Sequence, residues 1–229
     1  MIEVTYIDHM GSDLSVVNAA RVSFGKKSEW HQRIYSGEPN ILKGKDAKLI
    51  RYLAKHNHKS PFNHTFATFH VKAPVFVARQ LVKHEYMPWN EISRRYVDEE
   101  PDIYYPPNDV WRGRSPDKKQ GSDGEIDLKH PAKDGFLLDA LIEGNEWQLK
   151  LYRQLIKEGI APEQARMVLP QSMMSEWYWS GTLYAFAKMC QLRMKSDTQE
   201  ETQYVASKIA LTMAKIYPTS WDALMEYGT

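Results

Sequence analysis

Cysteine is nearly absent from this 229-residue chain, and Cys190 is the only one. A single cysteine excludes an internal disulfide framework and a cluster of thiolate metal ligands. Excess charge of one sign is also missing, because the formal net charge is only +1. Bulk charge therefore gives no reason to expect a nucleic acid or a membrane surface as a partner, and any anion site must come from local clustering.

Long apolar runs are missing as well. No stretch approaches the roughly 20 apolar residues that cross a bilayer. The first residues, MIEVTYIDHMGSD, carry acids where a signal peptide has a basic head followed by an apolar run. These absences predict a cytoplasmic protein with no membrane partner.

The common motifs of covalent and nucleotide-binding enzymes do not occur either. There is no Gly-x-Ser-x-Gly elbow, no phosphate-binding glycine-rich loop and no Rossmann fingerprint. Cys190 lies among Met189 and Leu192, which is typical of a small buried apolar residue rather than a nucleophile. If the chain is an enzyme, a bound cofactor should therefore carry the difficult step.

Three histidines, His56, His58 and His64, lie within nine residues. Neither a cysteine nor a regular helical His-x-x-x-His pair accompanies them, so we favour a polar loop that enters a strand over a metal site. We expect no bound metal.

Hydrophobic periodicity predicts few strands followed by a run of helices. That order favours an α+β fold in one domain, residues 1–229, over a doubly wound sheet. Two segments, 24–45 and 101–135, are rich in turn-forming residues and predict a loop and a long surface excursion. The expected strands are 3–7 and 65–71, and the expected helices begin at Asp13 and Asp46 and cover 136–157, 162–169, 175–194 and 198–216.

The most polar stretch is 78–96, ARQLVKHEYMPWNEISRRY. So many charged groups are costly to bury without partners, which could be solvent, protein or a ligand with a phosphate and a heterocycle. Arg166 and Arg193 lie farther along the chain among apolar neighbours. Each could form a salt bridge with Glu91, Glu163 or Glu176, or could grip a phosphate, since the planar guanidinium binds two oxygens at once.

The central stretch also resembles a known family. Lys83-His84-Glu85, then seven residues, then Ser93 is similar to the Arg-His-Arg-x7-Ser signature of flavin-dependent thymidylate synthases. Further blocks look like family blocks in family order: residues 10–24, 56–80, 90–96, 165–170 and the pair Leu192-Arg193. The resemblance covers most of the chain except about 25–45 and 107–135.

The resemblance implies a small, mostly antiparallel sheet packed with several helices, assembled as a homotetramer with sites where subunits meet. It implies FAD as cofactor, NADPH and methylenetetrahydrofolate as co-substrates, and the conversion of dUMP to dTMP. Arg193 matches the catalytic arginine, which favours the uracil anion deprotonated at N3. The implied dUMP-binding residues are Gln80, Lys83, Glu91, Ile92, Ser93, Arg94, Arg95 and Arg166, with Arg166 reaching the phosphate from a neighbouring subunit. The implied flavin-binding residues are His58, Ser60, Lys83, His84, Glu85 and Glu91.

Several positions depart from the family pattern. Lys83 replaces an arginine and so lacks the planar guanidinium that binds two oxygens at once, whereas Glu85 replaces an arginine and reverses its charge. Arg94 lies where the family commonly has glycine. Thr182, Tyr184 and Lys188 lie where flavin contacts are usually Asn, Arg and Asn. Substrate binding is thus better preserved than cofactor binding.

Two alternatives stay open at this point. A related enzyme could modify C5 of a pyrimidine nucleotide differently, for example by hydroxymethylation. A non-catalytic homologue that binds nucleotide or nucleic acid could have kept the arginines, although the near-zero net charge speaks against a nucleic-acid partner.

Overall fold

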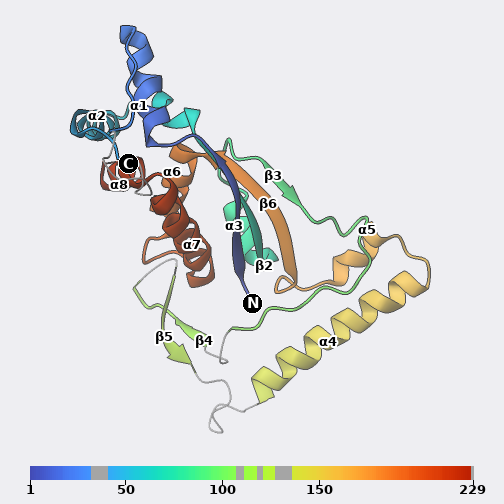
Figure 1. The fold of residues 1–229 in the computed structure, drawn as a ribbon. Coiled ribbons are helices and arrows are strands. Elements are labelled where there is room, and N and C mark those ends of the chain that lie inside the picture. Colours follow the sequence, from blue (N-terminus) through green and yellow to red (C-terminus); the bar gives the residue numbers. More distant parts are fainter. Residues whose placement is uncertain (32–40, 107–110, 118–120, 127–135, 228–229) are drawn as a thin grey trace.

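The fold is organised around a four-stranded antiparallel sheet with the strand order β1-β2-β6-β3 (Figure 1). The computed structural model describes residues 1–31, 41–106, 111–117, 121–126 and 136–227. The strands of the sheet are β1 (Glu3–Met10), β2 (Phe66–Pro74), β3 (Trp89–Glu91) and β6 (Met174–Thr182). The expected α+β class with a small antiparallel sheet is therefore confirmed, and both predicted strands are present.

Alternation along the two central strands separates the faces of the sheet. Phe69 and Val71 of β2, together with Trp177 and Trp179 of β6, are buried on the side that carries the core. Against this face pack α3 (Val75–Leu81), α6 (Leu183–Arg193) and α7 (Glu200–Ile216). The core thus fixes how α3 and α6 leave the sheet, and these two helices position most of the residues considered below.

The remaining helices gather at the two ends of the molecule (Figure 1). At one end lie α1 (Asp13–Arg21), α2 (Gly44–Lys55) and α8 (Pro218–Tyr227), with the 3₁₀ turns η1 (Val22–Phe24) and η2 (Ser60–His64). At the other end the long helix α4 (Phe136–Lys157) contacts chiefly α5 (Pro162–Ala165) and the turn η5 (Arg166–Val168). None of the described helices is both long and apolar enough to cross a membrane.

The expected helix 175–194 is wrong in its first half. Residues Met174–Thr182 form the central strand β6, which pairs with β2 on one side and β3 on the other, and the helix begins only at Leu183. Trp177 and Trp179 face the core while Tyr178 between them is half exposed, which is the period of a strand. The run is apolar enough to fit either structure, and the neighbouring strands decide between them.

Two acids expected to start helices have other partners. Helix α2 begins at Gly44, and the fully buried Asp46 accepts hydrogen bonds from Arg21 and Ser28. Asp13 does begin α1, but its carboxylate accepts the backbone N–H groups of Thr219 and Ser220, at 2.9 Å each, and so caps α8.

The expected surface excursion 101–135 contains an antiparallel hairpin, β4 (Trp111–Arg114) and β5 (Ser122–Ile126). Arg112 ties this hairpin to α7 through both carboxylate oxygens of Glu201, at 2.8 Å each, and through Glu200 at 2.9 Å. Residues 107–110, 118–120 and 127–135 of the predicted excursion, and 32–40 of the predicted loop 24–45, lie outside the described residues.

Candidate active site

Six of the predicted substrate-binding residues line one pocket of about 660 Å³, which we call the arginine pocket. These residues are Glu91, Ile92, Ser93, Arg94, Arg95 and Arg166. The first five lie where β3 ends and the chain turns, and the Ile92 N–H donates to the carbonyl of Glu176 on β6 at 2.9 Å. Arg166 reaches the same pocket from η5, the short turn that follows α5.

Three arginine side chains bring positive charge to the arginine pocket. Arg94 donates to the backbone carbonyl of Glu99 at 2.5 Å, and Arg166 donates to the carbonyl of Glu163 at 3.2 Å. Arg95 donates to the hydroxyl of Ser93 at 3.3 Å, and its guanidinium lies 5.0 Å from the centroid of the Tyr96 ring. Within the described ranges, none of these three guanidinium groups has a carboxylate at salt-bridge distance.

Among the described residues that line the arginine pocket, the single acid is Glu91, which already accepts hydrogen bonds from Ser175 and from the indole N–H of Trp89. Three cations therefore face one carboxylate that is engaged elsewhere. The salt bridge considered for Arg166 is not formed in the described chain, and this charge pattern suits a phosphate.

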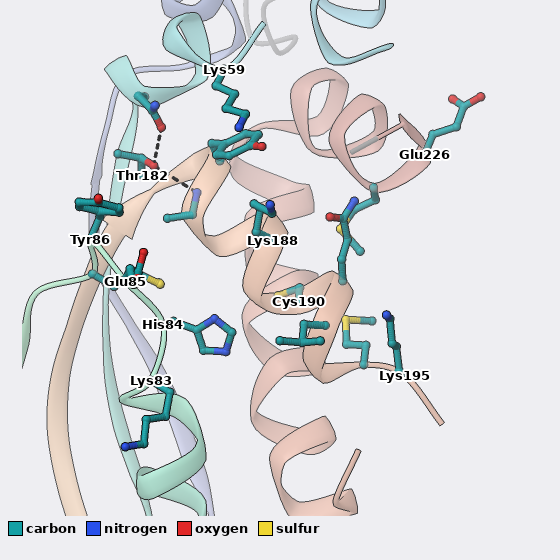
Figure 2. A pocket seen from close by; sticks show the side chains of 18 residues that line it. Lys59, Lys83, His84, Glu85, Tyr86, Thr182, Lys188, Cys190, Lys195 and Glu226 are labelled. Carbon is teal, nitrogen blue, oxygen red and sulfur yellow. Dashed lines mark hydrogen bonds between the residues drawn. The ribbon is translucent and has the colours of Figure 1, made fainter. Parts of the chain in front are cut away.

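A second pocket, of about 1370 Å³, runs along α6, and we call it the lysine pocket (Figure 2). Four lysines line it: Lys59, Lys83, Lys188 and Lys195. Two predicted flavin-binding residues, His84 and Glu85, line it as well, on the turn that follows α3. Figure 2 shows Lys83, His84 and Glu85 following one another on the sheet side, opposite Lys188 and Cys190 of α6.

Arg193, the predicted catalytic residue, lies beside the lysine pocket. Its Nε donates to His84 Nε2 at 2.9 Å, and its Nη2 donates to the Gln80 carbonyl at 2.8 Å. Burial and the nearby positive charge of Arg193 lower the pKa of His84 to about 4. His84 is thus neutral at pH 7 and can accept the hydrogen bond from Arg193.

The described chain does not bring all the predicted residues together. Gln80 lies next to Arg193, but its side chain bonds to Gln199 and Thr202 rather than facing the arginine pocket. Glu91 lines the arginine pocket, and Lys83 lines the lysine pocket, although each was expected to serve both ligands. His58 and Ser60 are exposed and are not among the residues that line either pocket.

The two pockets lie toward opposite ends of β6. Ser175 lines the arginine pocket and Thr182 lines the lysine pocket. Seven residues of extended strand separate them, which corresponds to about 23 Å. Arg193 lines neither pocket in the described chain, so the predicted convergence of the three arginines on one ligand stays a prediction.

Cys190 borders the lysine pocket but is unsuited to nucleophilic attack. Its Sγ donates to the carbonyl of Ala206 at 3.4 Å, and burial raises the pKa of the thiol well above its ordinary value. The reactive form of cysteine is the thiolate, which this environment disfavours. The structure thus gives Cys190 a packing role.

Sequence reasoning missed Lys59 and Lys195, which no spacing pattern connects with the signature segment. Among the described residues, no group of three or more His, Cys, Asp or Glu side chains is arranged to hold a metal ion. His56 and His58 instead pack against the ring of Tyr52, with centroid distances of 4.3 and 6.1 Å.

The fold and the two pockets define a class: an α+β protein with a helix-covered antiparallel sheet, an arginine-rich anion pocket and a larger pocket lined by lysines. The chain belongs to the thymidylate synthase complementing protein family, whose sequence model matches residues 5–219. This finding confirms the predicted family resemblance. A protein from Thermosipho africanus named flavin-dependent thymidylate synthase is 36% identical over 97% of this chain and 90% of its own length. One of the same name from Thermus thermophilus is 35% identical over 98% of this chain and 76% of its own length.

Solved structures with a similar fold are also methylases of a pyrimidine nucleotide. The UMP/dUMP methylase PolB from Streptomyces cacaoi, bound with 5-Br dUMP, is similar with a TM-score of 0.81 and 30% identity. The alignment covers 100% of this chain and 96% of that one. The same enzyme bound with 5-Br UMP has a TM-score of 0.80 and 29% identity, with 100% and 95% covered.

Proposed function

We propose that this protein is a flavin-dependent thymidylate synthase, an enzyme that converts dUMP to dTMP by reductive methylation at C5. The observation that carries the proposal is the arginine pocket, where three guanidinium groups face one engaged carboxylate. Relatives named for this activity share about a third of the sequence over nearly the whole chain. The solved methylase with a similar fold was bound to a dUMP analogue, which supports a pyrimidine nucleotide as substrate.

In this proposal the arginine pocket binds the nucleotide. Arg95 and Arg166 pair with the phosphate, because a guanidinium binds two oxygens in a fixed geometry. The Ser93 hydroxyl and the backbone carbonyl of Ile92 supply further polar contacts. Arg193 favours the uracil anion, since a cation beside a deprotonated N3 stabilises that form. The added electron density makes C5 a better carbon nucleophile, and no protein cysteine has to attack the ring.

The lysine pocket fits a flavin dinucleotide. Its volume of about 1370 Å³ exceeds the roughly 300–1,000 Å³ of ordinary small-ligand pockets, so it has room for FAD. Lys83, His84 and Glu85 would hold the cofactor on one side, and the residues of α6 would hold it on the other. When bound, FAD supplies the reducing chemistry, with NADPH as reductant and methylenetetrahydrofolate as the one-carbon donor.

We also propose a homotetramer in which each site uses more than one chain. In one chain, Arg193 bonds to His84 and Gln80 and does not line the arginine pocket. A second copy that brings its arginine pocket to Arg193 and His84 would complete the site. Met167, which lines the arginine pocket, and Tyr96, which follows Arg95 in the chain, are 79% and 77% exposed, as apolar residues at a subunit contact would be in an isolated chain.

The test is turnover by the purified protein with dUMP, methylenetetrahydrofolate, NADPH and FAD, read as product mass. We expect dTMP, and UMP should be run in parallel because the similar methylase is described for both nucleotides. A hydroxymethylated product, or dUMP binding without any product, would favour the alternatives over this proposal.

A companion variant tests the role of Arg193. Arg193→Ala should abolish turnover while size-exclusion chromatography and circular dichroism remain unchanged. Activity near that of the unaltered protein would show that another group stabilises the uracil anion.

A further inference from the structure

The arginine pocket contains one acid whose position decides how much of the positive charge there is available to a ligand. Among the described residues that line this pocket, only Glu91 has a carboxylate. Glu91 ends β3, and the chain continues from it toward Arg94 and Arg95. A carboxylate that shares a pocket with guanidinium groups competes with any bound anion, since it can pair with those groups itself.

Both oxygens of the Glu91 carboxylate already accept a hydrogen bond from the sheet. Oε1 accepts the hydroxyl of Ser175, and Oε2 accepts the indole N–H of Trp89 at 3.1 Å. Neither donor carries a charge, so the two bonds orient the carboxylate without neutralising it. In the ranges that the structure describes, no arginine lies at salt-bridge distance from Glu91.

The two donors belong to the most regular part of the fold. Ser175 lies on β6, the strand between β2 and β3, and is only 5% exposed. Trp89 lies on β3 and stacks on Trp177 of β6, with ring centroids 4.4 Å apart and ring planes at 18°. The strands β3 and β6 run side by side (Figure 1), and their register places Glu91 opposite Trp177. Strand pairing and ring packing therefore fix both donors.

Without these two bonds, the Glu91 carboxylate would be free to turn toward the arginines. Arg95 follows Glu91 by four residues and donates to the Ser93 hydroxyl at 3.3 Å, which is long for a hydrogen bond. A charged acceptor would replace that contact, because charge-assisted hydrogen bonds are the stronger ones. An arginine–carboxylate pair formed in this way would cancel positive charge that the phosphate of a nucleotide needs.

We propose that Ser175 and Trp89 are positioning residues of the nucleotide site: by bonding the Glu91 carboxylate, they keep it from pairing with the arginines. This inference rests on the proposed function, in which Arg95 and Arg166 bind the phosphate of dUMP. Neither donor is among the site residues that the sequence predicted. Ser175 lies outside the segments that carry the family resemblance, and Trp89 occupies an unspecified position of the signature.

The experiment compares a ligand with a phosphate and one without it in two protein backgrounds. Calorimetry measures the binding of dUMP and of deoxyuridine to the unaltered protein and to Ser175→Ala, Trp89→Phe and the double variant. Phenylalanine keeps an aromatic ring and removes the N–H donor. The same substitutions are repeated together with Glu91→Gln, which replaces the carboxylate by an uncharged amide. The matched control is Ser180→Ala, because Ser180 lies on the same strand, bonds to Thr68 and lines neither pocket.

Each single substitution of a donor should weaken dUMP binding about threefold, and the double variant about fivefold, the scale of an exposed charge pair. Deoxyuridine binding should not change, because this ligand has no phosphate with which the carboxylate can compete. In the Glu91→Gln background, the same substitutions should change dUMP affinity by less than about twofold, since no carboxylate is left to release. Ser180→Ala should bind both ligands as the unaltered protein does.

The Glu91→Gln background separates a positioning role from general damage to the site. Equal losses of dUMP affinity in both backgrounds, or equal losses for dUMP and deoxyuridine, would show such damage and overturn the inference. Unchanged dUMP affinity in the double variant would also overturn it, while leaving the proposed function intact. If Ser175→Ala does not fold, Trp89→Phe with and without Glu91→Gln tests the same carboxylate through its other oxygen. Failure of the unaltered protein to bind dUMP would overturn both proposals.

Discussion

Removing the guanidinium of Arg166 is the sharpest perturbation of the proposed nucleotide site. Arg166 is exposed on η5, and its one described hydrogen bond goes to the carbonyl of Glu163, so truncation should leave the fold intact. A hydrogen bond to a charged partner contributes about 1.5–3 kcal/mol, which corresponds to roughly tenfold to 150-fold in affinity. Because the side chain is exposed, we expect the lower end, and Arg166→Ala should weaken dUMP binding about tenfold.

The assay is calorimetric titration with dUMP and, in parallel, with deoxyuridine, which lacks the phosphate. Only dUMP binding should respond to Arg166→Ala. Arg166→Lys should be intermediate, because lysine keeps the charge but loses the planar fork. Arg51→Ala, on the distant helix α2, is the matched control.

Two outcomes would refute the reasoning about Arg166. If dUMP and deoxyuridine lose affinity equally, the variant has damaged the site rather than removed a phosphate contact. If dUMP affinity is unchanged at low salt, where a charge contact is strongest, Arg166 does not bind the phosphate.

Three further predictions concern the cofactor pocket and the fold. Glu85→Arg changes the local charge by two units and should tighten FAD binding about threefold to tenfold by fluorescence titration; unchanged affinity would show that Glu85 is compensated locally. Asp13→Ala removes the buried carboxylate that caps α8 and should lower the free energy of unfolding by about 2 kcal/mol in urea, whereas Asp139→Ala on the surface of α4 should leave it unchanged. The folded pKa of His84, about 4, lies below its ordinary value of 6.5, so the unfolded chain binds more protons between these pH values. The contribution of neutral His84 to the free energy of unfolding is thus complete above about pH 6.5 and is lost as the pH falls toward 4. His84→Gln should therefore make the urea midpoint depend less on pH between about 4 and 6.5. An unchanged pH dependence would contradict the burial of a neutral His84 beside Arg193.

The amphipathic helices were the most predictable part of the fold, because the apolar stripe that identifies such a helix lies within the helix's own sequence. The stripe along 136–157 predicted α4 with the bounds that the structure has, and 198–216 predicted α7 to within two residues. Strand β6 was misread because what identifies a central strand is its partners. Trp177 pairs with Val71 on one side and with Glu91 on the other, and both are distant in sequence.

Asp13 and Asp46 show that local sequence also does not identify the bonding partner of a single side chain. Asp13 and Asp46 have the residue type and spacing of helix caps, and local sequence offers no reason to look further. Their actual partners lie far along the chain: Asp13 bonds to residues 206 and 207 positions away, and Asp46 to one 25 positions away. Helix α8 was not predicted at all.

The sequence by itself determined the α+β class, the family resemblance and the segment 91–95, because consecutive residues at the end of one strand stay together in any fold. It also determined that Cys190 is no nucleophile, since its apolar neighbours indicated burial. Tertiary structure alone decided that Arg166 joins the arginine pocket, that Arg193 turns to His84 instead, and that Lys59 lies near the ring of Tyr184. Those contacts depend on how helices leave a shared sheet, and no spacing along the chain encodes the direction in which a helix leaves a strand.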